Sequence, residues 1–206
     1  DLFVQKGGLE KQLELLTKQI KGVNLLEQLK KELSELSAQI EKLKLSIQQR
    51  DYAQKVNRDR AMYEIEKNVI YILKNDLDRQ KEFKNPNKVD IDFYGDSFSL
   101  DGNFNFSASS NTYFKNAIRF SIFIASLSLD FMRYPKFILC DNMEDKGMEK
   151  ARTQNFQNLI VKISESFIDK VEHQIIFSTS EIADELDNTP YCVGKYYDQN
   201  NRTLKV

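Results

Sequence analysis

The sequence predicts an α/β lobe that follows a long helical arm, and three observations support this. Apolar residues recur at alternating steps of three and four through much of the first 80 residues. At Val89 the pattern changes abruptly to alternating apolar and polar residues. The order helix, apolar strand, helix, apolar strand then follows, which is typical of a sheet with helices on both faces. We therefore expect an arm over residues 1–84 and a compact lobe over residues 85–206.

The apolar positions of the arm follow a heptad pattern. Steps of four and three average 3.5 residues, the period that keeps one seam facing a partner helix in a coiled coil. The pattern slips near Gly22 and weakens after Ile47, so it leaves open whether the arm is one rod or two helices. A long amphipathic helix packed in a bundle is the alternative, but the length of the seam favours a coiled coil. The seam consists of Leu9, Leu13, Leu16, Ile20, Val23, Leu26, Leu29, Leu33, Leu36, Ile40, Leu43 and Ile47.

The arm is expected to end at Lys84-Asn85-Pro86-Asn87, because proline and asparagine stop a helix. Residues 89–94 then alternate apolar and polar side chains, the period of a half-buried strand. Gly95 and Asp96 predict a turn, and residues 98–100 predict a return strand.

Two helices and two buried strands are expected next. Helical periodicity covers residues 111–129 and 149–170. Short apolar runs at residues 136–141 and 174–178 predict strands that are apolar on both faces and lie inside a sheet. Residues 191–206 predict a final hairpin.

The composition excludes several kinds of site. Cys140 and Cys192 are too few for a disulfide framework, and Cys140 lies in an apolar run typical of a core. His173 is the only histidine, and neither a zinc site nor Ser/His/Asp catalysis has its usual spacing. No apolar run approaches the roughly 20 residues that cross a bilayer. Asp1–Gly8 lack the features of a signal peptide, so we expect a cytoplasmic protein without a membrane partner.

The charges divide unevenly along the chain. Residues 1–88 hold 18 Lys/Arg and 14 Asp/Glu, and residues 89–206 hold 12 and 17. Neither half has the strongly basic character of a dedicated nucleic-acid domain. Any contact with DNA would therefore come from a local patch.

One candidate site residue is Asp141, which ends the apolar run in PKFILCDNMED, residues 135–145. A carboxylate at the carboxyl edge of a parallel sheet lies where open α/β folds bind nucleotides. Mg²⁺ takes hard oxygen ligands, so this carboxylate suits a metal ion bound to phosphate. Strands that end in aspartate are common, and the alternative is a turn or capping residue.

A second candidate site is the small-residue segment Ser107-Ala108-Ser109-Ser110-Asn111, which leads into the expected helix. Small residues at a helix N-terminus let backbone N–H groups and a hydroxyl approach a phosphate, and the helix dipole favours the anion. The alternative is an ordinary loop with a helix cap.

In their joint order, these segments resemble the C-terminal lobe of SMC/Rad50-like ABC-type ATPase heads, together with the antiparallel coiled-coil arm of that family. The run ending in Asp141 resembles the Walker B motif, and residues 107–111 resemble a degenerate signature motif. Thr179 and Ser180 stand where such heads place a switch histidine. Asp145-Lys146-Gly147-Met148 takes the place of the D-loop. The resemblance covers nearly the whole chain.

The chain departs from the family pattern at several positions. Asn142 stands where the family has its catalytic glutamate, and an amide cannot accept a proton from water as a carboxylate can. Glu144 would substitute if the loop bends. Ala108 and Ser109 replace signature glycines. The chain has no Gly-x-x-x-x-Gly-Lys-Ser/Thr loop, so the resemblance implies that a separate N-terminal lobe must complete the nucleotide site.

The resemblance implies that two heads sandwich ATP and Mg²⁺. Residues 107–111 of one head would face the γ-phosphate held by the other, and Asp141 would hold Mg²⁺. The implied partners are the N-terminal lobe, a second head in a homodimer, DNA, and accessory or effector subunits. Similar heads serve in DNA repair, chromosome organisation and bacterial defence against phage. The degenerate motifs favour a defence-type member, nucleoid-associated if bacterial.

The alternative function is that of a non-enzymatic coiled-coil interaction protein. In that case Asp141 and the serine-rich segment are structural, and the lobe is a degenerate, ATPase-like scaffold.

Overall fold

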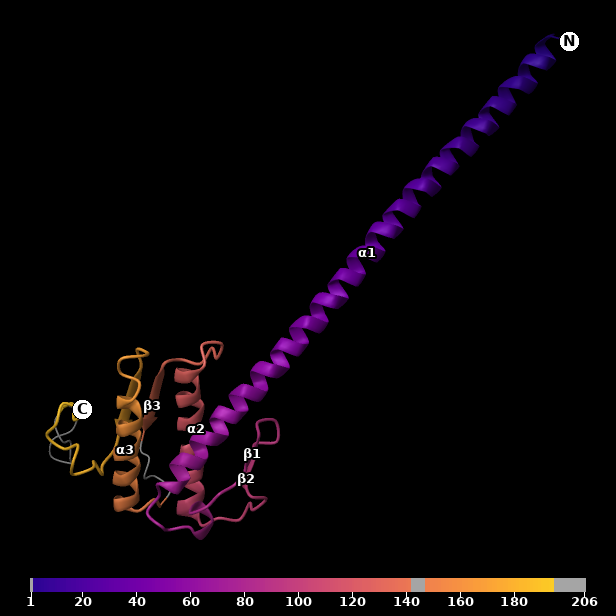
Figure 1. The fold of residues 1–206 in the computed structure, drawn as a ribbon. Helices are drawn as coiled ribbons and strands as arrows, with labels where there is room; N and C mark the ends of the chain where they lie inside the picture. Colours follow the sequence, from indigo (N-terminus) through magenta and orange to yellow (C-terminus); the bar gives the residue numbers. More distant parts are fainter. Residues whose placement is uncertain (1, 142–146, 195–206) are drawn as a thin grey trace, which may run out of the picture. The chain divides into compact units, whose positions relative to one another are not determined.

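The computed structural model describes residues 2–141 and 147–194 of the chain, and it shows a mixed α/β protein (Figure 1). Contacts divide the chain into two compact units, Asp1–Val56 and Asn57–Val206. The elements in chain order are α1 (Leu2–Lys74), the 3₁₀ turn η1 (Lys81–Phe83), β1 (Val89–Asp92), β2 (Ser97–Leu100), α2 (Ala108–Ser128), β3 (Phe137–Asp141), α3 (Lys150–Glu165) and β4 (Gln174–Ser178).

The first unit is the N-terminal part of α1, which runs as one helix through the pattern slip at Gly22. Nothing lies within 4 Å of the position a side chain would take at Gly22, so packing within the chain does not require glycine there. The twelve apolar seam residues from Leu9 to Ile47 are 48% to 70% exposed. This unit therefore carries a long apolar stripe that the described residues leave uncovered.

In the second unit, β1 and β2 form an antiparallel hairpin in which Val89 pairs with Leu100 and Asp92 with Ser97. β1 ends two residues earlier than the sequence predicted, because the Asp92 carboxylate accepts the turn N–H groups of Tyr94 at 2.9 Å and Gly95 at 3.1 Å. A Cβ on Gly95 would lie 2.7 Å from Asp92 Oδ2, so this turn favours glycine.

β3 and β4 form a parallel pair whose register places Phe137 opposite Gln174 and Asp141 opposite Ser178. Their inward side chains pack against the core. On the other face, Phe137, Leu139 and Ile176 are 45%, 59% and 40% exposed. The sequence predicted burial of both faces, but in the ranges the structure describes only one face is covered. The inward side chains are Ile138, Cys140, Ile175 and Phe177.

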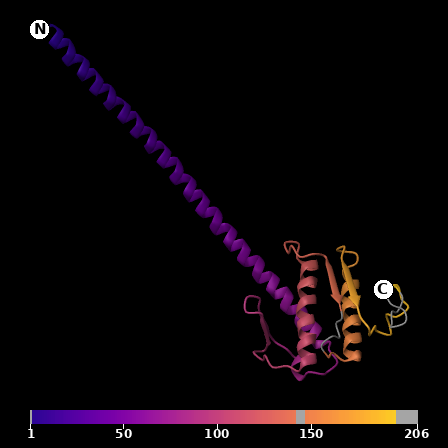
Figure 2. The same cartoon turned by 180° about the vertical axis from the view of Figure 1, so that it is seen from behind.

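α2 is the central element of the core of the second unit, beside α3 and the β3–β4 pair (Figure 2). Phe120 of α2 stacks on Phe177 of β4 with centroids 5.4 Å apart and meets Phe156 of α3 edge-on, also at 5.4 Å. Phe114 meets Phe98 of the hairpin edge-on at 4.8 Å. Aromatic contacts thus join α2 to the hairpin, α3 and β4.

The helix ends differ from the sequence predictions. α2 begins at Ala108, three residues early, because Ser107 caps it. α3 ends at Glu165, five residues before the predicted end, where the Ser166 hydroxyl donates to the Ile163 carbonyl at 2.7 Å. The predicted final hairpin falls mostly outside the described residues, and residues 191–194 contain no strand. Within the described ranges, no helix has both the length and the apolar character to cross a membrane.

Candidate functional site

The serine-rich segment forms the capped N-terminus of α2. The Ser107 hydroxyl accepts the N–H of Ser110 at 3.2 Å, and the Ser107 carbonyl accepts the N–H of Asn111 at 2.8 Å. Ser107 and Ala108 are exposed, whereas Ser109 and Asn111 are half-buried and Ser110 is buried. The segment therefore serves as a helix cap, as the structural alternative requires, while its first N–H groups are placed at a helix N-terminus.

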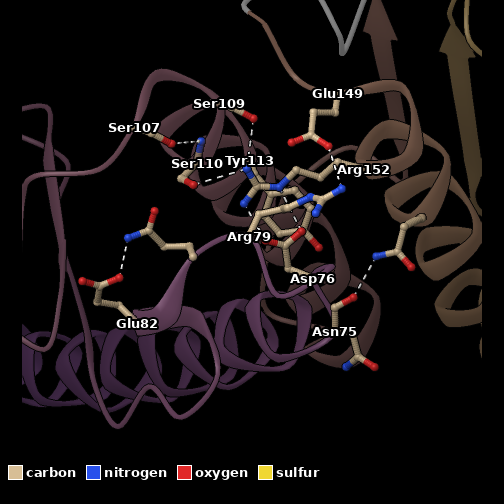
Figure 3. Close-up of polar contacts among 12 residues, drawn as sticks. Asn75, Asp76, Arg79, Glu82, Ser107, Ser109, Ser110, Tyr113, Glu149 and Arg152 are labelled. Atoms are coloured by element: carbon tan, nitrogen blue, oxygen red, sulfur yellow. Dashed lines mark hydrogen bonds and ion pairs between the residues drawn. The ribbon is translucent and has the colours of Figure 1, made fainter.

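Arg152, in the first turn of α3, lies under this segment (Figure 3). Its Nε donates to Asp76 Oδ1 at 2.9 Å, and its Nη2 donates to Asp76 Oδ2. Its Nη1 donates to the hydroxyls of Ser109 at 3.0 Å and Ser110 at 3.2 Å. The side chains of Arg152 and Asp76 are 1% and 2% exposed, so this is a fully buried ion pair. It fixes the start of α2 to the turn that follows α1.

The Tyr113 ring packs against the buried pair of Arg152 and Asp76. The Arg152 guanidinium lies 4.7 Å from the centre of the Tyr113 ring, and the Tyr113 hydroxyl donates to the Ile72 carbonyl at 3.1 Å. Burial raises the pKa of the Tyr113 phenol well above its usual value, the Asp76 carboxylate raises it further, and Arg152 opposes the shift. The phenol therefore keeps its proton and remains a donor to α1.

We expect the stability of the protein to fall above pH about 10 because of Tyr113. Below that pH both states hold the phenol proton, so the free energy of unfolding does not depend on it. Above it the unfolded chain loses the proton first, and stability falls by at most about 1.4 kcal/mol per pH unit. Urea unfolding at pH 8 to 11 measures this, and Tyr113→Phe should reduce the slope at a cost of about 1 kcal/mol. Tyr52→Phe, an exposed control, should retain the slope; an unchanged slope in Tyr113→Phe would contradict the assignment.

The predicted metal ligand Asp141 is exposed at the carboxyl end of β3, opposite Ser178 of β4. Its carboxylate and the hydroxyls that follow β4 are hard oxygen donors, the kind that suits Mg²⁺. In residues 2–141 and 147–194, no group of three or more His, Cys, Asp or Glu side chains could hold a metal ion. The predicted catalytic residues Asn142 and Glu144 lie outside the described residues, as do positions 145 and 146 of the D-loop-like segment.

Thr179 and Ser180 come directly after β4, and α3 braces the turn they begin. The Thr179 hydroxyl accepts the N–H of Glu181 at 3.0 Å. The buried Gln157 of α3 donates through Nε2 to the Glu181 carbonyl at 3.0 Å and accepts the Ala183 N–H at 2.8 Å. Gln157 Nε2 also lies 3.4 Å from the Thr179 oxygen. This amide holds the segment after β4 in one conformation.

α3 thus contacts two of the predicted site segments. Arg152 in its first turn holds the start of α2, and Gln157 one turn later holds the segment after β4. Lys150 adds an ion pair with Glu181 at 3.2 Å. Asp141 is brought next to the end of β4 by strand pairing rather than by α3.

His173 forms hydrogen bonds through both ring nitrogens. Its Nδ1 lies 2.7 Å from the Val171 carbonyl, which can only accept, so Nδ1 carries the proton. In the neutral ring, Nε2 then accepts a hydrogen bond from the Ser164 hydroxyl at 2.7 Å. Cys140 and Cys192 are both half-buried.

Sequence reasoning missed Arg152, Asp76 and Gln157. A helical signal for Arg152 does exist, because Arg152 lies four residues before Phe156 and eight before Ile160, on the apolar face of α3. A charged residue at an apolar helical position predicts a buried ion pair. Its partner Asp76 is distant in sequence and carries no comparable signal.

Comparison with known proteins leaves the resemblance drawn from the sequence without further support. No protein-family model matches this chain, and neither does a curated protein.

Proposed function

We propose that the chain is the C-terminal half of a divergent SMC/Rad50-like ATPase head, which binds ATP and Mg²⁺ between two engaged heads. The observation that supports this best is the contact of α3 with both the serine-rich start of α2 and the segment after β4. A nucleotide site assembled from loops needs such bracing, because small displacements of phosphate-facing groups weaken binding strongly. The parallel pairing of Asp141 with Ser178 adds a carboxylate at the same strand ends.

Within this proposal each segment has a distinct task. Asp141 supplies an oxygen ligand for Mg²⁺, directly or through water. The N-terminus of α2 presents N–H groups and the Ser107 and Ser109 hydroxyls to a phosphate held by the opposite head. Thr179 or Ser180 donates a hydrogen bond in place of a switch histidine. Glu144 would deprotonate the attacking water, or Asn142 would orient it. ATP hydrolysis is proposed only for the completed head.

The exposed face of the β3–β4 pair supports a role for the N-terminal lobe as partner. Parallel strands occur almost only where both faces of the sheet are covered. Phe137, Leu139 and Ile176 form an apolar patch on a face that the described residues do not cover. We propose that the lobe carrying the Walker A loop covers this face. An antiparallel helix of the same ATPase would likewise cover the apolar stripe of α1.

The proposal also includes coupling to DNA, a homodimer of heads, accessory or effector subunits and a function in anti-phage defence. The proposed location is the cytoplasm, in association with the nucleoid if the protein is bacterial. These follow from the resemblance and from the degenerate motifs. The second candidate, a coiled-coil scaffold with an ATPase-like lobe, is favoured by the caps and buried bonds that give the serine-rich segment a structural role.

ATP-dependent association of the head, completed with its N-terminal lobe, tests the proposal. We expect light scattering to detect dimers with ATP and Mg²⁺ but not in Asp141→Asn, which removes the ligand charge. Ser107→Arg should also prevent dimerisation, by placing a bulky side chain on the phosphate-facing surface. Asp169→Asn, an exposed carboxylate beyond the other end of α3, is the matched control and should dimerise like wild type.

If the two lobes bind each other but ATP changes nothing, the scaffold alternative replaces the proposal. If dimers form, ATP turnover in Glu144→Gln and Asn142→Ala will show which residue acts on the water. Loss of turnover in Glu144→Gln with dimerisation retained would identify Glu144 as the base.

A further inference from the structure

We infer that Arg152 is a positioning residue that fixes the start of α2 and turns the Ser109 hydroxyl into a hydrogen-bond donor towards an anionic ligand. The positioning rests on the contacts alone. The identity of the anion, a nucleotide phosphate, rests on the proposed function.

Contacts on every side hold the guanidinium in one orientation (Figure 3). Nε and Nη2 form a two-pronged pair with Asp76, and Nη1 reaches Ser109 at 3.0 Å and Ser110 at 3.2 Å. The Tyr113 ring lies 4.7 Å away and the Phe83 ring 5.9 Å away. Such a planar fork cannot rotate without breaking several of these contacts together.

The Arg152 guanidinium can only donate, and this sets the direction of its hydrogen bond with Ser109. A guanidinium has no acceptor, so the Ser109 oxygen must accept the bond from Nη1. The hydroxyl hydrogen of Ser109 then points away from Arg152. Ser109 is half-buried, whereas Ser110 is buried, so Ser109 is the serine of this pair that can reach a ligand from solvent. The hydrogen of Ser109 would therefore donate to an anion at the N-terminus of α2.

Arg152 does not attract the anion through its positive charge. Asp76 neutralises it within a pair whose side chains are 1% and 2% exposed. The favourable field for an anion comes from the helix N-terminus. Arg152 contributes geometry, and a lysine in its place would keep the charge but lose the fork that reaches Asp76 and the serines at once.

Hydrogen exchange on the full chain tests the positioning without any nucleotide. The double variant Asp76→Leu/Arg152→Met removes both charges. Replacement of a buried ion pair by apolar side chains often leaves the stability of a protein unchanged. We expect amides of Ser110 to Tyr113 to exchange about tenfold faster in this variant, with core amides around Phe156 unchanged. Arg152→Lys should act in the same direction. Wild-type exchange at the start of α2 in both variants would overturn the positioning role.

ATP-dependent association of the completed head tests the donor role. We expect Ser109→Ala and Arg152→Lys each to weaken association about tenfold, as for loss of a hydrogen bond to a charged group. The combination should be little worse than either, because both changes remove the same donor. The control is Thr153→Val, beside Arg152, because its buried hydroxyl has no hydrogen-bond partner among the described residues.

The outcomes separate the two claims. Wild-type association in Ser109→Ala, or fully additive losses in the combination, would overturn the donor role while the proposed function stands. Absence of ATP-dependent association in wild type would refute the proposed function and the donor role with it. Hydrogen exchange would then still decide whether Arg152 positions the start of α2.

Discussion

Arg152→Met is expected to reduce the free energy of unfolding by about 3–5 kcal/mol, because it leaves the buried Asp76 carboxylate without a counter-charge. Ser109 and Ser110 lose their shared donor in the same variant. Urea unfolding should be followed by near-ultraviolet circular dichroism of tyrosine, since the chain has no tryptophan. This signal reports tertiary packing rather than the helix content of α1.

The double variant Asp76→Leu/Arg152→Met provides the control for this effect. It removes the partner charge as well, so we expect it to recover most of the stability lost in Arg152→Met. Equal losses in the single and double variants would show that packing of the Arg152 side chain, rather than the unpaired charge, sets the cost. A loss below about 1 kcal/mol in Arg152→Met would contradict the buried ion pair itself.

Phe120→Ala should destabilise the protein by a similar amount, about 3–5 kcal/mol, through the cavity it leaves in the core. Phe120 is fully buried and contacts Phe156 of α3 and Phe177 of β4. Removal of the Phe120 ring would therefore weaken the packing of α2 against both α3 and β4. Thermal or urea unfolding of the full chain measures the effect.

Phe93→Ala makes the same chemical change at an exposed aromatic in the hairpin turn and serves as the matched control. Phe93 is 58% exposed, so we expect a change within about 0.5 kcal/mol. If both variants lose the same stability, Phe120 does not occupy the centre of the core. The difference between the stability losses of Phe120→Ala and Phe93→Ala therefore tests the packing of Phe120 in the core.

Local patterns in the sequence predicted most of the secondary structure. β4 spans Gln174–Ser178, as the apolar run indicated, and β3 begins one residue later than expected. These elements could be predicted because apolar runs and helical periodicity are properties of neighbouring residues. The errors lie at ends such as Asp92 and Ser107, where one side chain hydrogen-bonds the backbone and sets the boundary.

The candidate site was likewise predicted only in part. The order of the motifs predicted site residues at Ser107–Asn111, Asp141 and Thr179–Ser180. Their roles remain predictions, and Asn142 and Glu144 lie outside the described residues. The contacts of Arg152 with Asp76, 76 positions apart, and of Gln157 with the segment after β4 did not emerge from the sequence.

The sequence by itself determined the helical character of the arm and the α/β order of the lobe, because helical periodicity and apolar runs are properties of neighbouring residues. Tertiary structure alone decided which face of the β3–β4 pair is covered, that Asp76 is the counter-ion of Arg152, and that α3 braces two site segments. These features depend on residues brought together from distant parts of the chain. Burial then makes each polar group find a partner, and only the folded chain determines which partner is within reach.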